Sequence, residues 1–427
     1  MSSVRSGAPP AFFVLERRAD RTGAPTAVTE APYQIMGRQM YLLGSGPPGA
    51  NEISAWWEEG TGDCHIYRAR LSLNGDSEAV KTQFAKIIAS IPAALVDPSA
   101  GKTGLLAEIP LEHVPSSIAV MPFEGRLFVA DREGGLSAFD TATNALLNRV
   151  VLPLTERVPP VITAIPFTKR VYVTDFGGDR VLVIDGTTLA LITTVPTGRA
   201  PTAVASDAKA NRIYVACLGR QSARASESVP GSVTIIDGNT STALATVPTH
   251  GHLVTLDVHP TIGRLYVGAL GLPGESSFIQ VVDIRTSSEV ASVGVSPPDA
   301  LVADPVDNVV YALSRATGTS FGSKWIELDP RTNGAGTFID GPGDARAMGW
   351  HPGSDDRYRR IYVASHTDLG GILHIYRTFS GTLRLGEVGM VRVGTDPVAI
   401  AVDGATHRVY VASAGTKTVS VVLQGPG

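Results

Sequence analysis

Histidine, arginine and aspartate side chains stand directly ahead of apolar segments at roughly regular intervals along the chain. One aligned position holds His113, Arg157, Arg199 and Asp344, and the next holds His252 and Asp396. An imidazole or a carboxylate can move a proton, whereas a guanidinium binds a carboxylate, a phosphate or a developing enolate. If they converge in space, these groups predict acid–base chemistry or anion recognition, with a histidine as acid or base and the arginines stabilising negative charge.

The same residues also have a purely structural interpretation. Groups of opposite charge that crowd around one axis can neutralise one another, so ligand binding and structural filling both stay open. The alignment of Asp344 is open by one residue. Asp131 and Asp175 stand where other units have serine, cysteine or alanine, and a short carboxylate there is expected to cap a turn.

Two more candidate residues lie in predicted loops. Each of these loops follows the second apolar segment of a repeated unit and is expected on the same face as the residues above. Arg220 lies in the long loop 217–231, and His366 follows an apolar segment. Further long loops are expected at 271–277 and 317–323. Because the extra length falls on one side only, it predicts a pocket or a binding surface, for a metabolite or for a protein. No metal-ligand spacing, nucleophile motif or phosphate loop is present, so we expect neither a metal nor a cofactor.

The elements that position these groups are visible as a repeat. A basic or small residue followed by an apolar, an aromatic and an apolar residue occurs seven times, beginning at Arg126, Arg170, Arg212, Arg264, Val309, Arg360 and Arg408. Successive copies start between 42 residues (Arg170 to Arg212) and 52 residues (Arg212 to Arg264) apart. That length suits four short strands per unit, and the β-branched and aromatic residues of each copy favour a strand.

A second feature of the repeat is an aspartate at the end of the third apolar segment. It occurs in five units, at Asp140, Asp185, Asp237, Asp283 and Asp329. A short side chain that binds its own backbone in a tight turn explains all five.

The pattern Arg-x-Tyr-Val, followed further along by Val-x-Val-Ile-Asp, resembles the YVTN repeat of seven-bladed β-propellers. The resemblance covers residues 104–427 and implies an all-β ring of seven four-stranded antiparallel blades. Val309 lacks the arginine, and the third strand of the sixth unit, 372–376, lacks the aspartate. Propellers of this kind are scaffolds, binding modules and enzymes alike, so the resemblance implies a fold more than a function.

The strand count predicts how such a ring closes. The seventh unit ends after a third strand at 418–423, whereas segment 105–111 precedes the first unit as a fourth strand precedes the other units. Pairing of these two segments would leave no open edge.

Residues 1–103 lie outside the repeat and form a predicted extension. Strands are expected at the apolar runs Phe12–Leu15, Met40–Leu43, Ile53–Trp57 and His65–Leu73. Asp76 then caps a predicted helix whose apolar stripe, 80–91, has three- and four-residue spacing. Because a helix must bury such a stripe, we expect the extension to pack on the side of the propeller or to cap one mouth; an independent domain is the alternative.

Composition indicates which partners and which cellular compartment to expect. The net charge of −4 disfavours nucleic acid, which needs a concentrated basic field. The apolar run 12–15 is too short for a secretory signal, and no stretch is long enough to span a membrane, so we expect a cytoplasmic protein without a membrane partner. Cys64 and Cys217 match no metal or redox spacing and are expected to be free thiols, with a disulfide left open.

Two functions remain open at this point. In the first, the central funnel binds a polar or anionic small molecule, and the protein is a metal-independent lyase, isomerase or cyclase. In the second, the same face binds a protein without turnover. A deep, closed cavity favours the first and a wide face with exposed apolar patches the second. A similarity to the propeller subunits of quinone-dependent amine dehydrogenases is poorly supported, because those work outside the cytoplasm with cysteine-rich partners. The oligomeric state is open.

Overall fold

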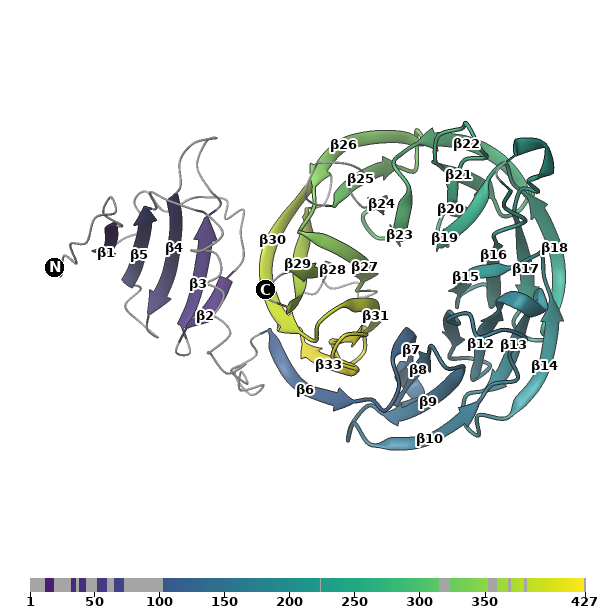
Figure 1. Cartoon of the computed structure of the whole chain (residues 1–427), viewed down its shortest axis with the longest axis horizontal. Coiled ribbons are helices and arrows are strands. Elements are labelled where there is room, and N and C mark those ends of the chain that lie inside the picture. Colours follow the sequence, from purple (N-terminus) through teal and green to yellow (C-terminus); the bar gives the residue numbers. More distant parts are fainter. Residues whose placement is uncertain are drawn as a thin grey trace.

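The computed structural model contains seven four-stranded antiparallel sheets arranged as the blades of a ring (Figure 1). It describes residues 103–222, 224–314, 323–351, 359–367, 370–379 and 382–425, together with the backbone of five strands between residues 12 and 72. The predicted all-β fold, a seven-bladed propeller with four antiparallel strands per blade, is confirmed.

Each blade runs from an innermost first strand to an outermost fourth strand. Blades 1 to 3 consist of β7 (Pro115–Met121), β8 (Arg126–Asp131), β9 (Gly135–Asp140), β10 (Leu146–Val151), β11 (Ile162–Ile165), β12 (Arg170–Asp175), β13 (Arg180–Asp185), β14 (Leu191–Pro196), β15 (Pro201–Asp207), β16 (Arg212–Cys217), β17 (Ser232–Asp237) and β18 (Thr242–Pro248). Blades 4 to 6 consist of β19 (His252–His259), β20 (Arg264–Leu270), β21 (Phe278–Asp283), β22 (Ser288–Gly294), β23 (Pro298–Asp304), β24 (Val309–Ser314), β25 (Lys324–Asp329), β26 (Gly334–Asp340), β27 (Asp344–Trp350), β28 (Arg360–Thr367), β29 (Gly370–Phe379) and β30 (Thr382–Val393). Blade 7 combines β31 (Pro397–Asp403), β32 (Arg408–Ser413) and β33 (Thr418–Leu423) with β6 (Gly104–Pro110).

The middle strands of each blade are buried because neighbouring blades cover both of their faces. In β12, Val171, Tyr172 and Val173 are fully buried, and Tyr172 packs in one cluster with Ile213 and Val215 of the next blade. The repeated Arg-x-Tyr-Val segment is therefore the core of the ring. Because both faces of this strand are covered, its residues are apolar almost without interruption.

The ring closes through a strand from the beginning of the propeller. β6 pairs antiparallel with β33, with Gly104 opposite Leu423 and Pro110 opposite Thr418. Innermost strands of neighbouring blades contact one another in the order β7, β11, β15, β19, β23, β27, β31 and back to β7. The blades therefore form an unbroken circle with β7 beside β31.

The arginine that starts the repeated segment binds the next blade. The guanidinium of Arg170 donates to the carbonyls of Gly238 (2.8 Å) and Asn239 (2.7 Å) in the turn between β17 and β18. Arg126 makes the same contact with the turn between β13 and β14. Arg408 of blade 7 donates to the carbonyl of Thr141 in blade 1. The arginine thus ties each of these blades to its successor.

The aspartates that end third strands cap the turns that follow. Asp140 accepts the backbone N–H of Ala142 (3.0 Å) and of Thr143 (2.7 Å). The same contact is made at Asp185, Asp237, Asp283 and Asp329. Hydrogen bonds from Thr143 hold the pKa of Asp140 below its usual value. The turn interpretation of this motif agrees with the structure.

Before the ring, the chain forms a separate five-stranded sheet in the order β1-β5-β4-β3-β2. Its strands are β1 (Phe12–Arg18), β2 (Pro32–Ile35), β3 (Arg38–Leu43), β4 (Glu52–Glu59) and β5 (His65–Ser72). Four of them coincide with the predicted apolar runs, and β2 was not predicted. The predicted helix at 76–91 and Cys64 lie outside the described residues. Packing of residues 1–103 on the propeller, or over one mouth, stays a prediction.

Candidate functional site

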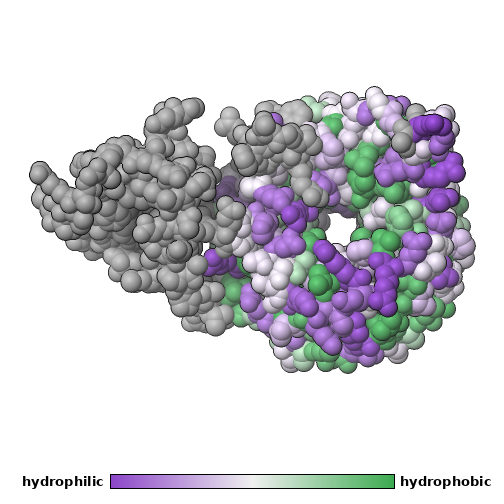
Figure 2. Space-filling view, in the orientation of Figure 1, coloured by the Kyte–Doolittle hydropathy of each residue, from purple (hydrophilic) through white to green (hydrophobic). Residues whose placement is uncertain are grey.

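One end of the ring carries all the candidate residues, and we call it the upper face. It is formed by the loops leading into the first strands and the loops after the second strands. Antiparallel pairing brings these loops together, as Pro115 opposite Asp131 and Pro201 opposite Cys217 show. The space-filling view shows that the ring is open at its centre, with hydrophilic and hydrophobic residues mixed around the opening (Figure 2).

A β-bulge near the start of the first strand fixes the alignment of the upper face. Asp344 stands directly before Ala345, the last paired residue ahead of the bulge in β27. His252 and Asp396 hold the equivalent position in their blades. The aligned position of Asp344 was thus wrong by one residue, because blade 6 has Ala345 where five other blades have a proline.

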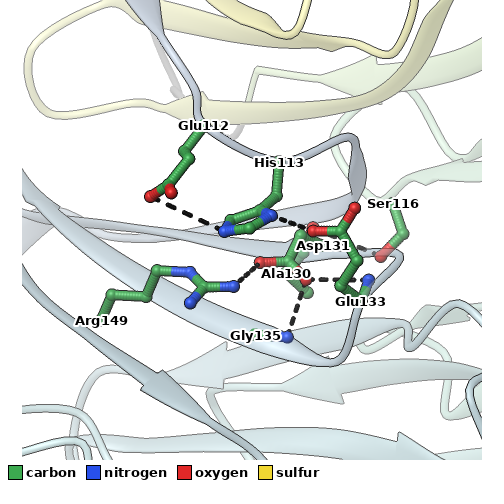
Figure 3. A network of polar contacts seen from close by, with 8 residues as sticks. All are labelled: Glu112, His113, Ser116, Ala130, Asp131, Glu133, Gly135 and Arg149. Carbon is green, nitrogen blue, oxygen red and sulfur yellow. Dashed lines mark hydrogen bonds and ion pairs between the residues drawn. The ribbon is translucent and has the colours of Figure 1, made fainter.

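In the loop leading into blade 1, His113 lies between two carboxylates. Its Nδ1 is paired with Glu133, and its Nε2 lies 3.7 Å from Glu112. Figure 3 shows Glu133, from the loop after β8, pointing at the imidazole. The side chain of His113 is 27% exposed, so a ligand at this face can reach it. The carboxylate on Nδ1 orients the imidazole, and Nε2, with Glu112 at 3.7 Å, is the nitrogen in position for proton transfer.

Asp131 holds the loop that carries Glu133. Its Oδ1 accepts the backbone N–H of Glu133 (3.0 Å) and of Gly135 (2.7 Å), and its Oδ2 accepts Arg149 (2.9 Å). Asp131 is nearly fully buried. Its role is therefore the predicted capping role, and it positions the partner of His113 from below (Figure 3).

The two arginines predicted to bind a ligand are exposed. Arg157 precedes blade 2 and Arg199 precedes blade 3. No carboxylate binds either guanidinium among the residues that the structure describes. By contrast, Arg180 is bound by Asp175 at 2.8 Å. Blades 1 to 3 thus present one histidine and two free cationic side chains on consecutive leading loops.

The two predicted aspartates meet at Arg346, which is not among the predicted site residues. Arg346, the bulge residue of β27, donates to Asp344 at 2.6 and 2.9 Å and also to Asp396 of the next blade. Ser116 and Thr202 occupy the same bulge position in their blades and bind the carbonyl of Pro160 (2.8 Å) or of Leu253 (2.9 Å). Asp344 and Asp396 are thus already engaged in joining blade 6 to blade 7.

His252, Arg220 and His366 belong to blades 4, 3 and 6, whereas His113 leads into blade 1. His252 is only 3% exposed, and its Nδ1 lies 2.9 Å from the carbonyl of Leu218. Arg220 is exposed but donates to the carbonyl of Glu227 in its own loop, at 2.9 and 3.1 Å. His366 lies opposite Asp344 in the pairing of β28 with β27. Its Nδ1 is buried and has no hydrogen-bond partner in the described part of the chain.

A buried Ser–His–Glu arrangement in blade 6 was not predicted. His374 Nε2 lies 2.8 Å from Ser365 Oγ, and its Nδ1 lies 2.8 Å from Glu387. These residues come from three different strands, so no sequence motif reveals them. Ser365 is 0% exposed, which keeps substrates away from its hydroxyl. The arrangement is therefore a core hydrogen-bond network.

Cys217, the last residue of β16, is a free and buried cysteine. Burial raises the pKa of the free thiol of Cys217 to about 11, so the thiol stays protonated at neutral pH. Among the described residues, no group of three or more His, Cys, Asp or Glu side chains is arranged to hold a metal ion. None of the described helices is long and apolar enough to span a membrane.

Comparison with known proteins supports the fold and leaves the family open. No family model matches the chain, and no characterised protein matches it in sequence. A hydrazine synthase structure from Kuenenia stuttgartiensis is similar, with a TM-score of 0.61 and 16% identity over 79% of this chain and 99% of that chain. A structure described as a mitotic checkpoint complex gives a TM-score of 0.60 and 12% identity over 75% of this chain and 92% of that one. At such identities the likeness shows the propeller fold alone.

Proposed function

We propose that the upper face of blades 1 to 3 binds an anionic small molecule. The observation that carries the proposal is the pair of exposed arginines, Arg157 and Arg199, which no described carboxylate neutralises. They lie in the loops leading into blades 2 and 3, and His113 lies in the loop leading into blade 1. Guanidinium groups without an internal partner favour carboxylate or phosphate ligands.

His113 is the proton-transfer residue of this proposal. Its carboxylate partner Glu133 orients the ring, and the imidazole is partly exposed at the same end of the propeller as the two arginines. A metal-independent lyase, isomerase or cyclase needs such a base together with cations that stabilise the developing negative charge. His252, the other predicted acid or base, is too buried to meet a ligand in this arrangement.

A non-catalytic protein-binding role is the second candidate; it was predicted for the upper face, but the exposed aromatic residues that favour it lie at the other end of the ring. Phe123 and Phe167 are 80% and 73% exposed in the first turns of blades 1 and 2, at the end of the ring opposite the upper face. Glu124 and Lys169, ion-paired at 3.0 Å, join these two turns. Exposed aromatic residues in neighbouring turns are typical of protein contacts. The similar structure described as a mitotic checkpoint complex is itself an assembly.

A thermal-shift experiment with phosphate, malonate and citrate tests the anion proposal. The wild-type melting temperature should rise with at least one of these probes, since binding to the native state stabilises it. Arg199→Ala should lose most of that rise. Arg331→Ala, an exposed arginine in a turn at the opposite end of the ring, is the matched control and should keep it. If no anion shifts any variant while affinity capture recovers one protein, the enzyme proposal is wrong.

A further inference from the structure

We infer that His252 is a positioning residue of the upper face: through the carbonyl of Leu218 it fixes loop 218–231 and the backbone of Arg199. The inference rests on the proposed role of Arg199 in binding an anion. It gives His252 a role as a hydrogen-bond donor to the backbone, in place of proton transfer to a ligand.

The first step is the contact between the loop and the backbone around Arg199. The N–H of Leu218 donates to the carbonyl of Ala200 at 2.8 Å, and the N–H of Gly219 donates to the carbonyl of Arg199 at 3.1 Å. These two consecutive carbonyls belong to the residue that carries the guanidinium and to its neighbour. The base of the loop therefore determines how the backbone presents Arg199.

The second step is the contact from blade 4. His252 begins β19, and its Nδ1 lies 2.9 Å from the carbonyl of Leu218. A carbonyl oxygen only accepts, so Nδ1 is the donor in this contact. The Nε2 of His252 is buried and has no hydrogen-bond partner within the described ranges. Beside it, Gly231 donates to the carbonyl of Gly251 at 2.7 Å, so blade 4 holds both ends of the loop.

The third step is the stiffness of the loop itself. Arg220 and Val229 exchange two backbone hydrogen bonds of 2.9 and 2.8 Å, and the Arg220 guanidinium closes on the carbonyl of Glu227. Because the outer part is tied to itself, we expect the loop to move as one body about its base. Loss of the His252 contact is therefore expected to loosen residues 218 and 219 together.

The leading loop of blade 3 is held from its other side as well. Asp179 of blade 2 accepts the N–H of Ala200 at 2.7 Å, and Thr234 accepts the N–H of Gly198 at 3.1 Å. Ala200 adopts a positive φ of 54°, which such bonds must stabilise in a residue other than glycine. Blades 2 and 3 thus contact the backbone that flanks Arg199 directly, and blade 4 acts on it through Leu218.

Two substitutions at one position test the inference. In His252→Asn the amide nitrogen takes the place of Nδ1 and can still donate to Leu218, whereas His252→Leu fills the space without a donor. Hydrogen exchange at Leu218 and Gly219 is expected to be about ten-fold faster in the leucine variant and close to wild type in the asparagine variant. Trypsin cleavage after Arg220 should accelerate in the leucine variant alone.

The binding arm uses the probe anion that stabilises the wild type. His252→Leu should weaken its thermal shift, and His252→Asn should preserve it. Wild-type exchange rates in His252→Leu, or equally fast exchange in both variants, would overturn the inference. If no anion stabilises the wild type, the proposed function fails, and the exchange comparison still decides whether His252 fixes the loop.

Discussion

An arginine at the upper face can meet a ligand only if no carboxylate already binds it. Asp131 binds Arg149, Asp175 binds Arg180, and two aspartates share Arg346. Their positive charge is used within the protein. The cationic character that a ligand would encounter therefore comes from arginines that lack such partners among the described residues, and these include Arg157 and Arg199 in blades 2 and 3.

Replacing Arg346 by leucine is expected to destabilise the junction between blades 6 and 7. The change leaves Asp344 and Asp396 as two like charges without their shared cation. Because each side chain is about one-third exposed, we expect a loss of only about 1 kcal/mol at low salt and less at high salt. Urea unfolding at both salt concentrations measures it. Asp344→Asn with Asp396→Asn in the same background should restore stability, and a loss that ignores salt would contradict the electrostatic explanation.

Glu327 in β25 should make the folded protein sensitive to pH. Burial raises the pKa of Glu327 to about 7, whereas a glutamate in the unfolded chain titrates near 4.3. Between these values the unfolded chain releases a proton that the folded chain keeps, so stability falls as the pH rises. Glu327→Gln should match wild type at pH 4 and exceed it by roughly 1–3 kcal/mol at pH 8. An unchanged difference across this range, in urea titrations, would refute the prediction.

At the scale of the strands, the repeated arginine joins one blade to the next. Arg170 donates to two carbonyls and to the hydroxyl of Ser241 in blade 3. We expect Arg170→Ala to lower the free energy of unfolding by about 2 kcal/mol, since hydrogen bonds from a charged group are lost and carbonyls are left without a donor. Arg132→Ala removes an exposed guanidinium from the loop after β8 in blade 1. This variant should change the free energy of unfolding by less than about 0.5 kcal/mol. Equal effects of the two variants would contradict this role.

The strands were predictable from the sequence because each depends on a local pattern. Segments such as 171–173 are apolar along their whole length, and the turn aspartates bind residues only two or three positions away. The pairing of charges was not predictable in the same way. Arg346 and Asp396 lie 50 positions apart and meet only because blade 6 stands beside blade 7. Likewise, the sequence does not reveal where the bulge of β27 begins, because Ala345 stands where other blades have a proline. The alignment of Asp344 therefore differed by one residue from its place in the structure.

At the scale of the whole ring, stability depends on closure, because every blade covers the faces of two neighbours. The last strand of blade 7 comes from the start of the propeller, and Arg408 adds a contact from blade 7 to blade 1. Folding of the ring therefore requires both ends of residues 104–423 to be present together. An open ring would expose the core faces of two blades and two unpaired strand edges.

Deletion of residues 418–427 is expected to abolish cooperative unfolding. It removes β33, which separates β32 from β6, and leaves β6 with no partner. The buried side chains Val419 and Val421 are lost at the same time, so the core between blades 7 and 1 opens. Thermal unfolding followed by circular dichroism should change from one sharp transition to a broad one. Deletion of residues 426–427 keeps every strand and is the control, with an unchanged transition. If the longer deletion melted as sharply as the control, closure by β6 and β33 would not be what makes the ring fold as one unit.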